Sequence, residues 1–216
     1  MKIIRIITVT VLAIFAFAQA KSQERIDLDE SSRKLVEQRV KEEVGLFTGY
    51  LPEIADKKLP LKDRLFYRDA ALKLFIGKGE NYTEVILDNE GDSIDHVVRK
   101  AVTMEVTSLW RKTKNRRPMA KYLTGLANLN YKSVTIQTTK WHEMRVSEIR
   151  KIADGKYECT VYFEQIFIGR GDAFTTGDKT KKRVTCHIDV IETDFGLEIL
   201  VLLGDVEALE TKPLNS

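Results

Sequence analysis

Histidine and cysteine are scarce in this chain of 216 residues, which has three of the first and two of the second. His96, His142 and His187 are far apart in the sequence, and neither cysteine belongs to a closely spaced ligand pair. Metal sites in proteins use several such ligands at short spacings, and two cysteines cannot build the disulfide scaffold of a small secreted domain. The sequence therefore predicts no metal site and no cofactor, and a fold that depends on a hydrophobic core.

An excess of one charge is also missing, because 35 lysines and arginines face 32 acidic residues, a formal net charge of +3. Nucleic-acid-binding proteins neutralise many phosphates and need a large positive surplus, so we exclude that class of partner. The charges are unevenly distributed: residues 111–117 are basic without an acid, and acids dominate after Asp189. Such runs usually form solvated surface. The alternative is a docking surface for an anionic partner or for the acidic end of a second copy.

Long hydrophobic runs are absent except at the N-terminus. Lys2 and Arg5 precede an uncharged, mostly apolar stretch over residues 6–17, and Ala18-Gln19-Ala20 places small residues at the two positions that a signal peptidase recognises. The stretch is too short to span a bilayer. We therefore expect a signal peptide over residues 1–20, a mature chain that begins near Lys21 and is exported, and no transmembrane segment in the mature chain.

The remaining sequence changes from helical to strand periodicity along its length. Apolar residues recur at three- and four-residue spacing in three segments, which predicts amphipathic helices over residues 29–51, 60–76 and 118–129. Residues 101–109 alternate as a strand does, and residues 131–209 are almost continuously strand-like, with a hairpin turn at Asp154-Gly155. Residues 169–181 are polar and contain glycine, so we expect a loop there. Residues 78–100 favour an extra strand followed by a short helix.

This order of elements predicts one α+β domain over residues 21–216, in which the helices pack on one face of a strongly curved antiparallel sheet. The last strand, residues 199–203, is apolar on both faces, so we expect it to be central in the sheet or to face another subunit. The alternation places one set of residues on the inner face: Val102, Met104, Val106, Val134, Ile136, Met144, Val146, Tyr157, Cys159, Val161, Phe163, Gln165, Val184, Cys186, Ile188 and Val190. This set contains no carboxylate.

The order of elements resembles the nuclear transport factor 2-like superfamily over roughly residues 30–207. The strand at residues 102–109, the helix introduced by Arg117-Pro118 and the long final strands carry the resemblance. The segments 161–169 and 178–184 are similar to those of exported members from Gram-negative bacteria. The resemblance implies a cone-shaped domain with a cavity at its wide end, frequent homodimers, and a bacterial protein of the periplasm or a secreted one. Members include isomerase-like and dehydratase-like enzymes and many binding domains, so the fold alone does not define a function.

The acid-free inner face favours an exported, non-catalytic module that binds a small apolar ligand or a protein partner. The candidate cavity residues are His142, Tyr157, Phe163 and Gln165. One alternative is an isomerase, dehydratase or hydrolase at the same cavity, which would need an acid from a helix, such as Glu53, Asp56 or Asp69. Another is a structural subunit of a cell-envelope assembly, in which the basic and acidic segments of different subunits meet.

Cys159 and Cys186 fall on the same face of two strands that one hairpin connects. Pairing these two positions puts the centre of the hairpin between residues 172 and 173, inside the polar segment. The sequence thus permits either a cross-strand disulfide or two buried free thiols that pack as small apolar groups.

Overall fold

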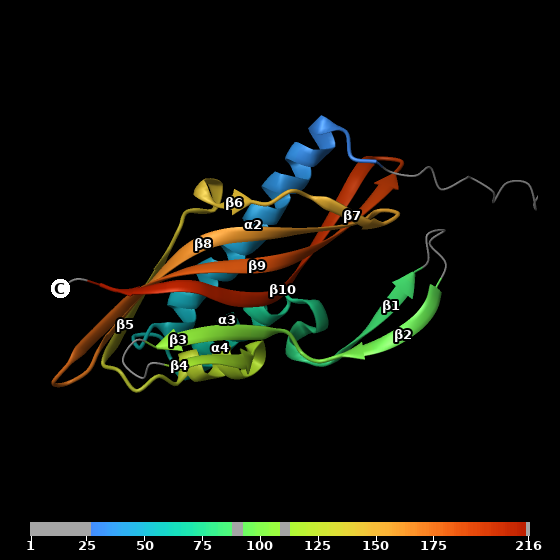
Figure 1. Ribbon diagram of the computed structural model, residues 1–216. Coiled ribbons are helices and arrows are strands. Elements are labelled where there is room, and N and C mark those ends of the chain that lie inside the picture. Colours follow the sequence, from blue (N-terminus) through green and yellow to red (C-terminus); the bar gives the residue numbers. More distant parts are fainter. Residues whose placement is uncertain (1–26, 88–92, 109–112, 215–216) are drawn as a thin grey trace, which may run out of the picture.

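The computed structural model describes residues 27–87, 93–108 and 113–214 (Figure 1). The expected signal peptide lies outside these residues. In the described part, three α-helices and two short 3-10 helices accompany ten strands. The helices α2, α3 and α4 pack against one face of a large curved sheet, which we call the covered face. This is the α+β arrangement that the sequence predicts.

The helices form where the apolar periodicity places them. Helix α2 spans Glu30–Ala55 and is capped at its N-terminus by Asp29, whose carboxylate accepts a hydrogen bond from the backbone N–H of Ser32 at 2.7 Å. Its apolar stripe, which includes Val40 and Phe47, is fully buried. Helix α3 spans Leu61–Leu72, the 3-10 helix η1 spans Ile76–Gly79, and helix α4 spans Met119–Ala127. All three predicted α-helices are confirmed.

The main sheet has the strand order β4-β3-β10-β9-β8-β5. The bounds are β3 Thr103–Ser108, β4 Thr113–Pro118, β5 Ser133–Thr138, β8 Lys156–Arg170, β9 Thr175–Thr193 and β10 Gly196–Pro213. Two short strands, β6 (Arg145–Val146) and β7 (Arg150–Ala153), also pair with β8. Strand β10 pairs antiparallel with β9 but parallel with β3, at Val206 and Met104. The sheet is therefore mixed rather than wholly antiparallel. Strand β10 is central, one of the two placements expected for residues 199–203.

A separate two-stranded sheet precedes the main one. Strands β1 (Tyr82–Leu87) and β2 (Ser93–Arg99) pair antiparallel and extend away from the helices and the main sheet in Figure 1. The strand expected near residue 82 is confirmed, whereas the short helix expected after it is wrong. Val97 and Val98 pair with Glu84 and Thr83 across the hairpin. Cross-strand pairing therefore outweighs the weak helical spacing of these residues.

The polar segment 169–181 is the main departure from the sequence prediction. Strand β8 continues to Arg170 and β9 begins at Thr175, so only residues 171–174 form the turn. The backbone N–H of Gly171 donates to the carbonyl oxygen of Phe174 at 2.9 Å and closes it. Strand β8 pairs with residues 175–189 of β9 along its whole length, which gives these polar residues the strict alternation of a strand. Half of them therefore point to the covered face.

The basic and acidic segments meet within the chain. Arg116 on β4 lies 3.3 Å from Glu105, 3.6 Å from Asp205 and 3.8 Å from Glu207. Lys114 lies 2.9 Å from Glu105. Strands β4, β3 and β10 are neighbours in the sheet, so Arg116 of the basic segment lies beside two acids of the acidic strand β10, Asp205 and Glu207. Residues 111 and 112 lie outside the described residues.

Candidate functional site

The structure does not bring the four candidate cavity residues together. Tyr157, Phe163 and Gln165 occupy alternate positions of β8 and are all buried on the covered face. Eight residues separate Tyr157 from Gln165, however, and at 3.3 Å per residue they lie roughly 26 Å apart along the strand. Tyr157 lies near the N-terminal end of α2, where Asp27 and Lys151 influence its hydroxyl. A single small ligand cannot contact both Tyr157 and Gln165.

His142 is the clearest correction to the predicted cavity. It lies on the 3-10 helix η2 (Trp141–Glu143), which follows β5 and contacts α2. Its side chain is 56% exposed and its Nε2 atom lies 3.7 Å from a carboxylate oxygen of Glu143. Because His142 lies in this short helix, the alternation of a strand does not apply to it and does not direct its side chain to the covered face. His142 is therefore a surface residue of the fold.

Buried polar side chains gather instead where β8, β9 and α4 meet. Tyr122 comes from α4, Gln165 from β8, and Asp178, Thr180 and Lys182 from alternate positions of β9. We call these five residues the Lys182 cluster. Gln165, Thr180 and Lys182 are each no more than 6% exposed, whereas Tyr122 and Asp178 are partly exposed. The cluster therefore reaches from the covered face of the sheet to the surface of the protein.

Lys182 is the least expected member, because lysine is rarely buried without a carboxylate partner. Its Nζ atom donates to the sulfur of Met104 at 3.3 Å and lies 5.8 Å from the centre of the Tyr122 ring. Within the described residues, no carboxylate lies within ion-pairing distance of Nζ. Burial lowers the pKa of Lys182 to about 8, although the negative charges of Asp178 and Glu105 oppose this shift.

Asp178 provides a carboxylate at the exposed edge of the cluster. Burial raises the pKa of Asp178, while a hydrogen bond from Thr180 and the charge of Lys182 act in the opposite direction. The Thr180 hydroxyl donates to Asp178 at 3.3 Å and can accept from the Thr211 hydroxyl, 3.1 Å away on β10. This chain of hydroxyl groups fixes the orientation of the carboxylate.

Tyr122 and Gln165 form the third part of the cluster. Burial raises the pKa of Tyr122 to about 12, and a hydrogen bond with the Gln165 side chain opposes the rise. The phenol therefore stays protonated at physiological pH. The carbonyl oxygen Oε1 of Gln165 is buried and accepts no hydrogen bond from the described residues. A buried acceptor without a donor destabilises the fold by about 1–3 kcal/mol.

Three residues of this cluster were missed at the level of sequence because they fall in or beside the expected loop. The signal that could have found them is the alternation itself. Val184, Cys186 and Ile188 point inward, and the same period extended backwards gives Lys182, Thr180 and Asp178. The prediction of an acid-free covered face is wrong for this reason. Helix α2 contributes another carboxylate to this face, that of Glu43, which is buried at 7% exposure.

Glu43 faces the cysteine pair in the middle of the sheet. Its carboxylate lies 3.2 Å from the guanidinium of Arg39, and burial raises its pKa. Cys159 and Cys186 are direct partners in the β8–β9 register and are both free and buried. A hydrogen bond with Cys159 and burial raise the pKa of Cys186 well above its ordinary value. Protonated, buried thiols of this kind are unreactive.

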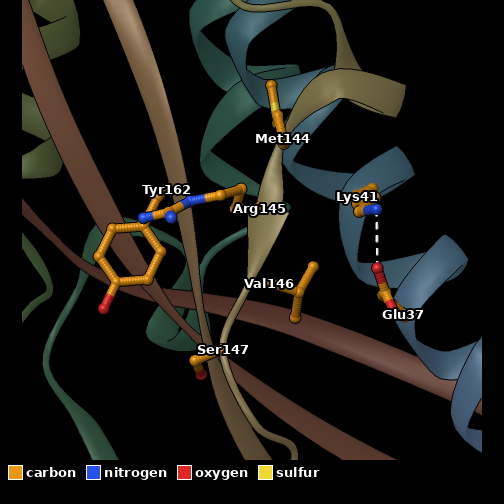
Figure 2. Close-up of a pocket in the computed structure, with 7 residues that line it drawn as sticks. All are labelled: Glu37, Lys41, Met144, Arg145, Val146, Ser147 and Tyr162. Atoms are coloured by element: carbon orange, nitrogen blue, oxygen red, sulfur yellow. Dashed lines mark ion pairs between the residues drawn. The ribbon is translucent and has the colours of Figure 1, made fainter.

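A surface groove of about 490 Å³ lies between α2 and β6 (Figure 2). Its lining residues are Glu37, Lys41, Met144, Arg145, Val146, Ser147 and Tyr162. Glu37 and Lys41 form an ion pair of 2.7 Å along the helix, and Figure 2 shows Arg145 turned away from α2 towards Tyr162. The guanidinium lies 5.5 Å from the centre of that ring. Glu37 and Lys41 of this groove thus neutralise each other, whereas Lys182 has no carboxylate within ion-pairing distance among the described residues.

Metal sites and membrane-spanning helices each have requirements that can be compared with the described residues. Among residues 27–87, 93–108 and 113–214, no group of three or more histidine, cysteine or acidic side chains is placed to hold a metal ion. None of the helices in these ranges has the length and apolar composition that a membrane-spanning segment needs.

Comparison of the sequence with protein-family models and with curated proteins gives no match. Among solved structures, the chain is similar to a proposed scytalone dehydratase from Novosphingobium aromaticivorans, with 10% sequence identity and a TM-score of 0.40. The similarity covers 86% of this chain and 93% of that one. At this level of likeness we draw no functional argument from it.

Proposed function

We propose that the protein is a small-molecule-binding domain whose ligand occupies the Lys182 cluster. One observation carries the proposal: a buried ammonium group without a carboxylate partner and a buried amide oxygen without a donor belong to two residues that both contact Tyr122. Folding leaves both groups in an unfavourable state, because each has lost water and gained no equivalent partner. A ligand that provides the missing partners would recover that free energy on binding.

The chemistry of the cluster defines the ligand in outline. Lys182 and Tyr122 are donors, so they suit a carbonyl or carboxylate oxygen, and Gln165 Oε1 suits a hydroxyl or N–H group. Phe163 and Met104 are buried on the same side of the sheet and suit an apolar body. The ligand is therefore a small, largely apolar molecule with one polar end. The expectation of a wholly apolar ligand is revised accordingly, because the covered face is not free of ionisable groups.

Native mass spectrometry of the purified full chain tests this proposal. We expect a copurified or added small molecule to be retained by the wild type and by Lys181→Met, since Lys181 is the exposed neighbour of Lys182 on β9. Lys182→Met and Gln165→Leu should each lose it. Equal retention in all four proteins would show that the ligand binds elsewhere, and the absence of any small ligand would contradict the proposal.

A catalytic function is the second candidate, because Asp178 provides the acid that an isomerase, dehydratase or hydrolase at this face would need. Its raised pKa and its fixed orientation suit proton transfer. Asp178→Asn distinguishes the two functions. A binding domain retains its ligand unchanged in both proteins, whereas an enzyme releases a chemically altered molecule that the variant no longer produces.

We also propose that the protein is exported, on the basis of residues 1–20 alone. Expression of the full chain in a Gram-negative host should yield a mature form whose N-terminal sequence begins at or near Lys21. A purified protein that still carries residues 1–20 would overturn this proposal. Native mass spectrometry of the mature protein would report whether the chain forms a homodimer.

A further inference from the structure

We propose that Lys182 is a carbonyl-reactive amine, and that the polar end of the ligand is an aldehyde or ketone that forms an imine with its Nζ atom. The inference rests on the proposed function and specifies its ligand class. It depends on the surroundings of the amine, on the neighbouring hydroxyl group and on the contrast with the other lysines of the same strand.

The surroundings of Lys182 favour the neutral amine. The stem of the side chain is buried between β3, β9 and α4, and Nζ meets a thioether sulfur and an aromatic ring rather than an anion. A desolvated lysine without a counter-ion loses part of its preference for the charged form, which is how nucleophilic lysines are activated. The titratable groups that face it are Asp178 on β9, Glu105 on β3 and Tyr122 on α4.

The population of neutral amine follows from these surroundings. With a pKa of about 8, roughly a tenth of Lys182 is neutral at pH 7, whereas less than about 0.1% of an ordinary lysine is neutral there. Asp178 and Glu105 lie too far away to form an ion pair, so they moderate the shift without abolishing it. The neutral amine is the nucleophile, and its share of the population sets the rate of attack.

Two lysines on the same strand provide an internal contrast. Lys179 lies 2.6 Å from Glu164, and Lys181 lies 3.2 Å from Glu210. Both point to the other face of β9, and their side chains are 43% and 54% exposed. Both ammonium groups are solvent-exposed and paired with a carboxylate. The alternation of the strand thus separates one candidate nucleophile from two ordinary lysines only one or three residues away.

The reaction balances within the site. The lone pair of Nζ attacks the carbonyl carbon, and a proton passes from nitrogen to oxygen to give a carbinolamine. The hydroxyl group then leaves with a second proton as water, and the carbon–nitrogen double bond forms. Tyr122 is protonated at neutral pH and can donate a hydrogen bond to the carbonyl oxygen during attack. No oxidant, reductant or cofactor is consumed.

Reductive trapping tests the inference. The folded full-length protein is incubated at pH 7.5 with propanal and sodium cyanoborohydride in limiting amounts, and the alkylated lysines are identified by peptide mass spectrometry. We expect Lys182 to be modified at least about tenfold faster than Lys179 or Lys181, because of its larger neutral fraction. Its rate should level off above about pH 8.

The inference would be overturned if Lys182 were modified no faster than Lys181. The Lys182 amine would then not be both neutral and accessible to the aldehyde, as the inference requires. Protein unfolded in urea provides the control, in which the three lysines should react alike. In the folded variants, Lys182→Met should abolish the fast adduct, Lys181→Arg should retain it, and Tyr122→Phe should slow it. If butyrate binds in a Lys182-dependent manner while propanal is not trapped, the proposed binding site stands and the imine does not.

Discussion

At the scale of single residues, the most consequential feature is Lys182, because its burial disfavours the charged form of the amine. Lysine side chains are nearly always exposed or paired, and Lys182 is neither. Natural proteins retain such costly groups mainly at functional sites, where the perturbed chemistry is used. Gln165 Oε1 is a second buried polar group without a hydrogen-bond partner, and Gln165 and Lys182 both contact Tyr122. Two unsatisfied groups around one residue are stronger grounds for a ligand site than either alone.

Lys182→Met should stabilise the protein at pH 7. The folded-state pKa of Lys182 lies below its unfolded-state value, so the unfolded chain binds more protons between about pH 8 and 10.5. The loss of folding stability caused by burying the charged amine is therefore complete below pH 8, and it decreases as the pH rises through that window. We expect the variant to be more stable by on the order of 2–3 kcal/mol at pH 7 and the difference to shrink towards pH 10.

Urea unfolding of both proteins at several pH values measures this difference. Subtracting the two curves removes the opposing contributions of Tyr122 and Cys186, whose raised pKa values make stability fall with pH above about 9. A variant less stable than the wild type at pH 7 would show that Lys182 has a favourable partner in solution.

At the scale of elements, the sequence predicts what hydrophobic periodicity controls. The three helices, the strand alternation and the turn at Asp154-Gly155 are confirmed, because each depends on local spacing or local turn chemistry. The segment 169–181 was misjudged for a physical reason. Its polar residues are held in strands by pairing with β8 over the whole hairpin, a non-local contribution that composition does not reveal.

The candidate site shows the same limit. The alternation of β8 predicts Gln165 on the covered face, whereas the loop expected over residues 169–181 obscures the same alternation in β9 and with it the position of Lys182. His142 was misplaced because η2 interrupts the strand period after β5. The parallel contact of β10 with β3 joins segments about 100 residues apart and has no sequence signature. Without it, the approach of Met104 to Lys182 could not be foreseen.

Two glycine substitutions test the element boundaries as a matched pair. Gly155 has φ +65° in the β7–β8 turn, and an added Cβ atom would lie 2.8 Å from the carbonyl oxygen of Val190. Gly155→Ala should therefore destabilise the protein by about 1–2 kcal/mol or more. Gly125 lies in α4 with open space around it, so Gly125→Ala should be stabilising by about 0.5–1 kcal/mol. Thermal unfolding of the two variants should show shifts of opposite sign, and shifts of the same sign would contradict the assigned turn or helix.

At the scale of the whole molecule, one buried core joins the helices to the sheet, and the cysteine pair lies within it. The structure holds Cys159 and Cys186 as free thiols opposite each other. A thiol reagent should leave both unmodified in the folded protein and react with both after unfolding in urea without reductant. If neither reacts after unfolding, the pair is bridged, as the other of the two sequence alternatives allows.

The arrangement of charge also belongs to this scale. Arg116 lies near Glu105, Asp205 and Glu207 of the same chain, so the acidic strand β10 is compensated without a second subunit. This removes the main ground for an envelope assembly built on complementary charged segments. A small-molecule site at the Lys182 cluster does not depend on any such assembly.

The protonation of Lys182 in the folded protein is the property on which the binding site and the imine both depend. It can be measured directly by NMR, from the shift of the Cε carbon in protein labelled at lysine, with Lys182→Met used to assign the signal. The account predicts a titration midpoint of about 8 for Lys182, separated from the other lysines. A midpoint above 10, within the group of exposed lysines, would contradict it.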